Sequence, residues 1–424
     1  MSDRDSVIAE LRQWLADTWD EDLALLAWRG LLADAGWARP SWPPGLCGRG
    51  LPASLDRVVA DELAAAGVPE PPDGVGTALA APVILEHGSE DLRRQLIRAT
   101  VTGEVTWCQL FSEPGAGSDL AGLASRAVPD GDGWLVTGQK VWSTGAATAD
   151  FGLLLARTDP DVPKHAGISA FALPMRQPGV TVRPLRQMNG HSSFNEVFLD
   201  EARVAAGDII GGPGDGWLVA RATLMRERRL QASQPAPVPA SAPGVPIGRA
   251  WREAIAERTT AAEPHKWYPQ RAGRPDLVID RARATGKAAD PVVRQEIARL
   301  IELTWSARWM SDRFARERVA PGAGPGAAGR PHGPEGSLTK LASSNIARQA
   351  ARVHALIAGT TGLLAGPDSA LHGIIAEILV SVPAISIAGG TDEIQRNIIA
   401  ERLLGLPREP DASRDLPFRA VPAG

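Results

Sequence analysis

The sequence predicts an α+β protein in which a β domain lies between two helical domains. Apolar side chains recur at helical spacing through the first hundred residues, whereas short β-branched or aromatic runs begin near Thr106. Helical spacing returns at Gly216. We therefore expect an N-terminal helical domain over residues 1–105, a middle β domain over 106–212, a C-terminal helical domain over 213–410 and a tail over 411–424.

The N-terminal helices are predicted from two periodic stretches. Val7 and Leu11 begin the first apolar stripe, and residues 55–66 repeat the pattern. Two segments rich in proline and glycine, 40–52 and 69–76, interrupt this helical region. We expect both segments to be loops, because proline removes a helical hydrogen bond and glycine disfavours ordered backbone.

The middle domain is predicted from six short runs bounded by turn residues. Each run is rich in β-branched or aromatic side chains, which suit a pleated and half-buried surface. In chain order the runs read WCQLF, GWLVTGQKVW, FGLLLART, GISAFALPM, VTVRPL and NEVFLD.

The C-terminal region is predicted to be helical, with two interruptions. Helical spacing is found in WLVARATLM, PVVRQEIARLIEL, LTKLASSNIARQAARVHALIAG and ALHGIIAEILV. The Pro-rich insertion at 234–247 and the Gly/Pro/Ala-rich segment at 321–334 cannot continue a helix. We expect both to be exposed linkers.

Composition excludes several classes of protein. The 424 residues are 44% hydrophobic and 22% charged, with a formal net charge of −4. These values are typical of a globular protein, and they provide no basic field for nucleic acid. The N-terminus lacks an apolar run behind a basic cluster, and no stretch approaches about twenty uncharged apolar residues. We therefore expect a cytoplasmic protein with no membrane span.

Cysteine usage excludes a disulfide framework and a cysteine-built zinc site, because the chain has only Cys47 and Cys108. Neither lies in a nucleophile motif, and both are expected to be small buried side chains. No metal site is predicted.

Three motifs occur in order: FSEPGAGSDLAGL at 111–123, GQKVWSTGA at 138–146 and GGTDEIQRNIIAERLLG at 389–405. At this order and spacing they resemble the acyl-CoA dehydrogenase family, and the resemblance extends over essentially the whole chain. It implies a middle β-barrel domain, a C-terminal four-helix bundle and bound FAD. It also implies oxidation of the Cα–Cβ bond of an acyl-CoA thioester to the trans-2-enoyl thioester, with flavin accepting the β-hydride.

The residue types in these motifs suit a flavin. Gly115 and Gly117 let the backbone approach a planar ring, an indole such as Trp142 can lie against it, and the Thr144 hydroxyl can reach its edge. The resemblance implies FAD contacts by Gln109, Phe111, Ser112, Gly117, Ser118, Trp142, Ser143, Thr144, Thr391 and Glu393.

Each of the three motifs has a structural alternative. The Gly/Ser segment could be a surface turn, and Trp142 could be one of the core residues among 13 tryptophans. Thr391 could cap the helix that begins near Asp392, although the N-terminus of that helix could also bind a pyrophosphate.

The catalytic base requires a carboxylate, and its usual place is empty. In the best-known branch of the family the base is the Glu of a Glu-Gly-Thr run, but here Gly389 stands in that position. Glu227 in TLMRERRL matches the helix position of the base in another branch, which includes isovaleryl-CoA dehydrogenase. Its structural alternative is a solvated residue on the helix surface, next to arginines. We hypothesise that Glu227 removes the α-proton and that its burial beside flavin and acyl chain raises its pKa in the bound complex.

Substrate contacts are implied for four positions. A glycine at 389 leaves room for a carboxylate from the facing helix and keeps a backbone N–H. We hypothesise that this N–H polarises the thioester carbonyl. The resemblance implies substrate contacts by Ser118, Arg228, Gly389 and Gly390.

Three functional alternatives stay open. The first is a dehydrogenase that passes electrons to an electron-transferring flavoprotein, and the second is an acyl-CoA oxidase on the same scaffold. The third is a structural subunit of an α2β2 heterotetramer, favoured by departures from the family pattern in RARATGKAADPVVRQ and in ALIAGTTG. A homo- or hetero-oligomer is expected, and the acyl group is left open, with fatty acid and steroid side chains as candidates.

Overall fold

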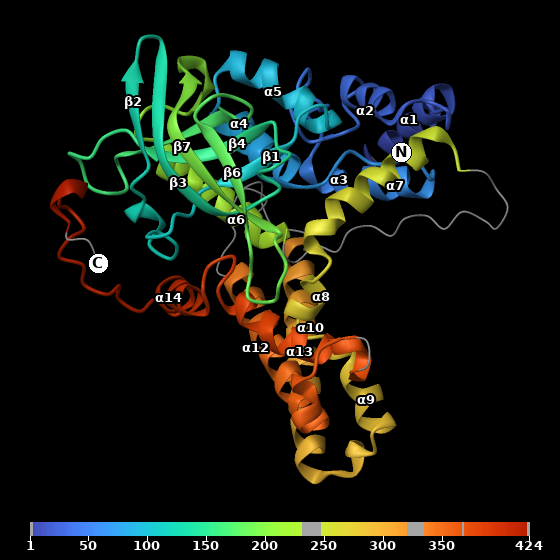
Figure 1. Ribbon diagram of the computed structural model, residues 1–424. Coiled ribbons are helices and arrows are strands. Elements are labelled where there is room, and N and C mark those ends of the chain that lie inside the picture. Colours follow the sequence, from blue (N-terminus) through green and yellow to red (C-terminus); the bar gives the residue numbers. More distant parts are fainter. Residues whose placement is uncertain (1–2, 231–246, 320–334, 367–368, 422–424) are drawn as a thin grey trace.

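The computed structural model describes residues 3–230, 247–319, 335–366 and 369–421 (Figure 1). Both predicted linkers, the insertion at 234–247 and the segment at 321–334, lie almost entirely outside these ranges. The described chain forms a helical N-terminal region, a mixed β-sheet and a helical C-terminal region. The order of helices, strands and helices is therefore confirmed.

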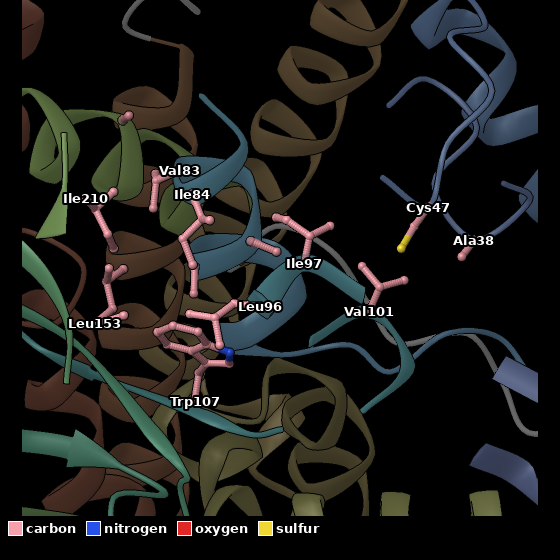
Figure 2. Packing of buried hydrophobic residues seen from close by; sticks show 14 of the residues in the cluster. Ala38, Cys47, Val83, Ile84, Leu96, Ile97, Val101, Trp107, Leu153 and Ile210 are labelled. Atoms are coloured by element: carbon pink, nitrogen blue, oxygen red, sulfur yellow. The ribbon is translucent and has the colours of Figure 1, made fainter. Parts of the chain in front are cut away.

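The N-terminal helices pack their apolar faces against one another and against the sheet. Figure 2 shows Ile84 and Leu96 turned toward Leu153 and Ile210 of the sheet, with Trp107 beside them. Ser89 caps the last of these helices, where its hydroxyl accepts from the Leu92 N–H at 3.1 Å. The helices are α1 (Asp3–Thr18), α2 (Leu25–Asp34), α3 (Asp56–Ala65), the π-helix η2 (Gly76–Ala80), α4 (Ala81–His87) and α5 (Glu90–Thr102).

The sheet is built mainly from antiparallel neighbours. Its strands are β1 (Trp107–Leu110), β2 (Arg126–Asp130), β3 (Gly133–Thr144), β4 (Phe151–Arg157), β5 (Ile168–Pro174), β6 (Val180–Leu185), β7 (Phe194–Ala205) and β8 (Ile209–Ile210). They run in the order β6-β7-β3-β2-β4-β5-β8, and β1 pairs in parallel with β4.

The prediction of a β-barrel is wrong, because the ladder of described strands ends at β6 on one side and at β8 on the other. The sequence explains why the ends do not join. Strand β8 has only two residues before Gly211, and β6 contains Pro184, which has no N–H to donate to a further strand. The middle domain is an open sheet.

The C-terminal region is helical, as predicted, and the four-helix bundle implied by the resemblance stays a prediction. Two long helices, α10 (Pro291–Val319) and α12 (Glu335–Ala358), pack side by side, and shorter helices contact α12. Proline and glycine between residues 264 and 291 break the preceding segment into short pieces. The other helices are α6 (Gly216–Leu230), α7 (Arg249–Ala262), α8 (Tyr268–Arg271), α9 (Val278–Ala284), α13 (Ile374–Ser381) and α14 (Asp392–Arg402).

Two contacts connect the C-terminal half with the N-terminal helices and with the sheet. Helix α7 packs on α2, where Arg29 forms a bidentate ion pair with Glu257 at 2.7 and 3.1 Å. After α14 the chain runs back to the side of the β-sheet, as Figure 1 shows for its red end. There the Phe418 N–H donates to the Val162 carbonyl at 2.9 Å.

Candidate active site

The segment from Phe111 to Leu123 follows β1 and is fixed to β3 by a buried ion pair. The Lys140 ammonium is fully buried, and it donates to Glu113 Oε1 at 2.7 Å and to the Phe111 carbonyl at 3.1 Å. Glu113 also accepts from the N–H groups of Ala124 and Ser125. The first two sequence motifs are therefore joined by one network.

The charge state of this network supports its structural role. Burial opposes ionisation of Glu113, but the adjacent Lys140 charge and the hydrogen bonds outweigh it and hold the pKa of Glu113 below its ordinary value. A buried carboxylate that stays ionised keeps its hydrogen-bond donors in place. Gly117 and Ser118 are exposed at the tip of the segment, and a Cβ at Gly115 or Gly117 would meet nothing within 4 Å.

Trp142 is placed by an irregularity of β3. The pairing of β3 with β7 shifts register between Lys140 and Ser143, and Trp142 has a φ of 63° there. A bulky residue in this left-handed region is rare, and it marks a backbone constrained by its surroundings. The side chain is 56% exposed and makes an edge contact with Phe194 at 5.7 Å between ring centroids. The bulge thus presents one indole face outward.

The bulge also aligns the neighbouring motif residues. The Val141 N–H donates to the Ser112 carbonyl at 2.9 Å, which brings the two motifs edge to edge. The Ser143 carbonyl accepts from Asn195, but the buried Ser143 hydroxyl has no partner among the described residues. An unsatisfied buried hydroxyl is costly unless a bound molecule bonds it. Thr144 comes next in the strand and is half-buried.

Glu227 lies on α6, which is seated tightly on the sheet. At the first residue of α6, Gly216, a Cβ would meet the Ser169 backbone at 2.5 Å, so only glycine allows this approach to β5. Further along the same helix, Glu227 Oε2 accepts from Gln109 Nε2 of β1 at 3.4 Å. Arg226 turns to Glu86 of α4 at 3.1 Å. The side chain of Arg228 lies outside the described residues.

Tyr268 of α8 is a neighbour of Glu227 that the sequence did not indicate. Burial raises the pKa of Tyr268, and the Glu227 charge adds to the shift while the nearby Arg271 opposes it. The Arg271 guanidinium lies over the phenol ring at 4.4 Å from its centroid. Tyr268 is the only tyrosine in the chain, but no motif marks it.

The third motif forms a tight turn before α14. Gly389 and Gly390 have φ values of 69° and 84°, which favour glycine. Gln395 donates to both of their carbonyls at 3.1 Å, and its own side-chain oxygen has no partner among the described residues. Thr391 Oγ accepts from the Ile394 N–H at 3.2 Å, so it does cap the helix.

Asp392, which no sequence pattern indicated, anchors this turn to α12. Its buried carboxylate accepts from Lys340 Nζ at 3.0 Å and from Ser344 Oγ at 2.8 Å. Burial opposes its charge, but these donors hold the pKa of Asp392 below its ordinary value. Its neighbour Glu393 is exposed and pairs with Arg396 at 3.2 Å.

The structure therefore brings the predicted residues together in two groups. Gln109 and Glu227 are in contact, and the first and second motifs are joined through Glu113, Lys140 and Ser112. The third motif is bonded within its own helix and to α12.

The two cysteines are buried thiols, as expected. Burial raises the pKa of Cys47 to about 11 and the pKa of Cys108 to about 12, so thiolate chemistry is disfavoured. The described part of the chain contains no cluster of potential metal ligands. None of its helices combines the length and apolar character that a membrane span needs.

The fold is therefore helices, an open sheet and helices, with an exposed indole at a bulge of β3 and a carboxylate of α6 in contact with β1. The chain matches family models over residues 4–104, 108–202 and 276–404, described as the N-terminal, middle and C-terminal domains of acyl-CoA dehydrogenase. The chain belongs to the acyl-CoA dehydrogenase family. Membership makes it an oxidoreductase that acts on an acyl-CoA, and it confirms the resemblance seen in the three motifs.

Individual relatives agree. The chain is 38% identical to acyl-CoA dehydrogenase FadE34 of Mycobacterium tuberculosis, over 89% of this chain and 46% of FadE34. The chain thus spans about half the length of that relative. It is 33% identical to acyl-CoA dehydrogenase IpdE1 of the same organism, over 96% of this chain and 99% of IpdE1.

Solved structures share the fold. The Tcur3481–Tcur3483 steroid ACAD matches with a TM-score of 0.63 and 25% identity, over 96% of this chain and 98% of that chain. The ChsE4–ChsE5 complex from Mycobacterium tuberculosis matches with a TM-score of 0.60 and 23% identity, over 96% of this chain and 99% of that chain.

Proposed function

We propose that the chain catalyses FAD-dependent α,β-dehydrogenation of an acyl-CoA thioester, with Glu227 as the base that removes the α-proton. The observation that carries this proposal is the contact between Glu227 of α6 and Gln109, two residues before the first cofactor motif. Glu227 provides a carboxylate, whereas position 389 in the turn before α14 is a glycine and provides none.

The residues present fit a flavin. The Trp142 indole is exposed at a bulge, where a planar ring can lie against it. The buried Ser143 hydroxyl has no partner among the described residues, and the polar edge of a bound ring could bond it. FAD, when bound, supplies the acceptor for the β-hydride. In this proposal the residues that hold it are Gln109, Phe111, Ser112, Gly117, Ser118, Trp142, Ser143, Thr144, Thr391 and Glu393.

Glu227 is suited to the α-proton by position and by orientation. The Gln109 amide donates to its carboxylate at 3.4 Å and so helps to fix its orientation. The absence of a side chain at Gly389 leaves room for the Glu227 carboxylate to reach the substrate. The Gly389 N–H then polarises the thioester carbonyl, which stabilises the enolate-like charge of the transition state. Ser118, Arg228 and Gly390 complete the substrate contacts.

Glu227→Gln tests the base. A general base contributes about a hundredfold or more to rate, so we expect flavin bleaching by a good acyl-CoA substrate to slow by at least about a hundredfold. FAD content is expected to stay at the parental level. Glu90→Gln is the control, because Glu90 is a helical glutamate too, but it lies in the first turn of α5, where it is exposed and pairs with Arg94. Bleaching at the parental rate in Glu227→Gln would exclude this role.

The acyl group and the electron acceptor are decided by one substrate panel. CoA thioesters of short, branched and steroid-like acyl groups are compared under air, with and without a dye acceptor. Turnover that needs the dye, or an electron-transferring flavoprotein, indicates a dehydrogenase, whereas peroxide formed without it indicates an oxidase. A steroid-like group belongs in the panel because one structural neighbour is titled a steroid ACAD.

We further propose that the chain works in a homo- or hetero-oligomer. Ile301, Trp305 and Trp309 recur every fourth residue on α10 and are 40%, 45% and 61% exposed. Exposed apolar side chains that lie next to one another on a helix are typical of an interaction surface. The neighbour titled the ChsE4–ChsE5 complex is a protein of two kinds of chain. The alternative is an α2β2 assembly in which this chain has a structural role. Evidence that Glu227 takes no part in catalysis would favour it.

A further inference from the structure

The segment after α14 docks on the loop between β4 and β5, residues 158–167, which we call the β4–β5 loop. The Phe418 N–H donates to the Val162 carbonyl at 2.9 Å, and the Arg419 N–H donates to the Pro160 carbonyl at 3.1 Å. Arg419 also pairs with Asp161 at 2.8 Å. Two backbone bonds and an ion pair seat the tail in a defined register, and Figure 1 shows the chain reaching the sheet.

Under the tail lies a buried cation. The Arg157 guanidinium, at the end of β4, lies over the Phe418 ring at 3.4 Å from its centroid. Arg157 is only 4% exposed, so the aromatic ring covers a charge that water hardly reaches. Cation–π contacts are strongest in this desolvated situation. Burial lowers the pKa of Arg157 to about 10, although the carboxylates of Glu113, Asp119 and Asp159 oppose the shift. Arg157 stays charged at neutral pH.

The other bonds of Arg157 hold the end of the first cofactor motif. Its Nη2 donates to the Ala121 carbonyl at 2.8 Å and to the Leu123 carbonyl at 3.1 Å, and its Nε also donates to Leu123 at 3.2 Å. These two carbonyls belong to the turn that closes the Phe111–Leu123 segment. One guanidinium thus joins the tail to the cofactor motif.

The β4–β5 loop makes two further contacts with the same site. Lys164 Nζ pairs with Asp119 of the motif at 2.9 Å. The His165 ring makes an edge contact with Trp217, in the first turn of α6, at 4.7 Å between centroids. The loop on which the tail docks therefore also contacts the motif and the helix that carries Glu227.

We propose that Phe418 is a positioning residue for the Phe111–Leu123 segment, acting through Arg157. The inference rests on the proposed FAD site in that segment. The ring shields the guanidinium from water, so the guanidinium keeps its bonds to Ala121 and Leu123. Without the ring, water competes for those donors, and the segment loses its fixed conformation.

The test compares Phe418→Leu, which keeps an apolar side chain without a ring face, with Phe418→Tyr, which keeps the ring. Leu416→Ala is the matched control, because Leu416 is exposed on the same tail. The FAD dissociation constant of each full-length variant is measured by quenching of flavin fluorescence. From the strength of a desolvated cation–π contact we expect the constant of Phe418→Leu to rise about threefold to tenfold. Phe418→Tyr and Leu416→Ala are expected to match the parent.

At saturating FAD, kcat of Phe418→Leu is expected within about twofold of the parent, because Glu227 and Gln109 are untouched. The KM for acyl-CoA is expected to rise, because Ser118 lies in the displaced segment. Equal FAD affinity in Phe418→Leu and the parent would overturn the proposal, as would an equal loss in Leu416→Ala.

A parent that binds no FAD would contradict the proposed function and leave this link testable. Amide hydrogen exchange over residues 120–125 is then compared in the parent and Phe418→Leu without cofactor. Faster exchange in the variant supports the link between Phe418 and this turn, and unchanged exchange overturns it.

Discussion

Trp142 shows how a single residue can be set apart from many of its kind. Thirteen tryptophans occur in the chain, and those of the N-terminal region lie in the core or pack against it. Trp142 alone among the described tryptophans has a left-handed backbone, and it is exposed at a bulge. Backbone strain of this kind persists where surrounding structure enforces it, often at functional sites. Its place in GQKVWSTGA could be seen in the sequence, but its conformation could not.

Gln109→Ala tests the contact that orients Glu227. Losing a hydrogen bond to a charged group costs about 1.5–3 kcal/mol, and at 3.4 Å the lower end applies, so we expect kcat to fall about tenfold. Steady-state turnover with a good acyl-CoA substrate measures it. Gln139→Ala is the control, because Gln139 makes the same kind of contact with Glu196, at 3.3 Å, away from Glu227. A parental kcat combined with weaker FAD binding would show that Gln109 serves the cofactor alone.

The residue scale also shows what a sequence can and cannot reveal. Glu227 was predicted because the usual position held a glycine and a second carboxylate stood on a suitable helix. Its contact with Gln109 joins residues 118 positions apart, and no local pattern encodes such a pairing. Tyr268 and Asp392 were missed for the same reason. Their importance comes from neighbours that only the fold supplies.

At the scale of elements, helix α12 supports the turn that precedes α14. Lys340 and Ser344 on α12 bond Asp392 at the start of α14, and so fix the turn at Gly389 and Gly390. Since all three side chains are buried, this is a structural link between two helices rather than a surface pair.

Asp392→Asn tests this link through the pH dependence of stability. The pKa of Asp392 is lowered from 3.8 on folding, so its contribution is fully present above pH 3.8 and is lost as the pH falls through the lower folded value. The variant leaves Lys340 buried without its carboxylate, and we expect it to be about 3–5 kcal/mol less stable at pH 7. The difference should shrink in acid. Urea unfolding at pH 7 and in acid measures the free energy of unfolding of parent and variant.

Asp61→Asn is the control for this experiment, because Asp61 forms an exposed pair with Arg57. Its effect should stay within about 0.5 kcal/mol at either pH. A difference between parent and Asp392→Asn that does not change with pH would contradict the assigned role of the Asp392 charge.

Local sequence patterns predict which segments are helices and strands better than they predict whether the sheet closes into a barrel. Periods of 3.6 and 2 residues identified helices and strands, because each element buries one face. Closure of a barrel depends on two distant edges, and here a two-residue β8 and a proline in β6 prevent it. Prolines between residues 264 and 291 also limit the helices there to short pieces, which helical spacing alone does not show.

At the scale of the whole molecule, the exposed stripe on α10 is the surface that we propose for assembly. Trp305 and Trp309 contact each other at 5.8 Å between centroids and face outward. An isolated chain would expose this apolar surface to water, at a cost that association removes.

A double variant, Trp305→Glu with Trp309→Glu, is therefore expected to shift the assembly to a smaller species. Light scattering after size exclusion, at equal protein concentration, measures the molar mass. Ser306→Glu is the control, because it adds charge to an exposed position of the same helix outside the stripe. An unchanged mass in the double variant, or a parent that is already monomeric, would contradict this interface.

The packing of α7 on α2 has an evolutionary consequence. Arg29 is almost fully buried and is bonded in bidentate fashion by Glu257, although the two residues lie 228 positions apart. Loss of Glu257 would leave the buried Arg29 charge without its carboxylate, and the two N–H···O bonds suit the guanidinium–carboxylate pair in particular. Among homologues that keep this crossing of α7 over α2, positions 29 and 257 should therefore change together, and their covariation would be a signature in an alignment of this branch.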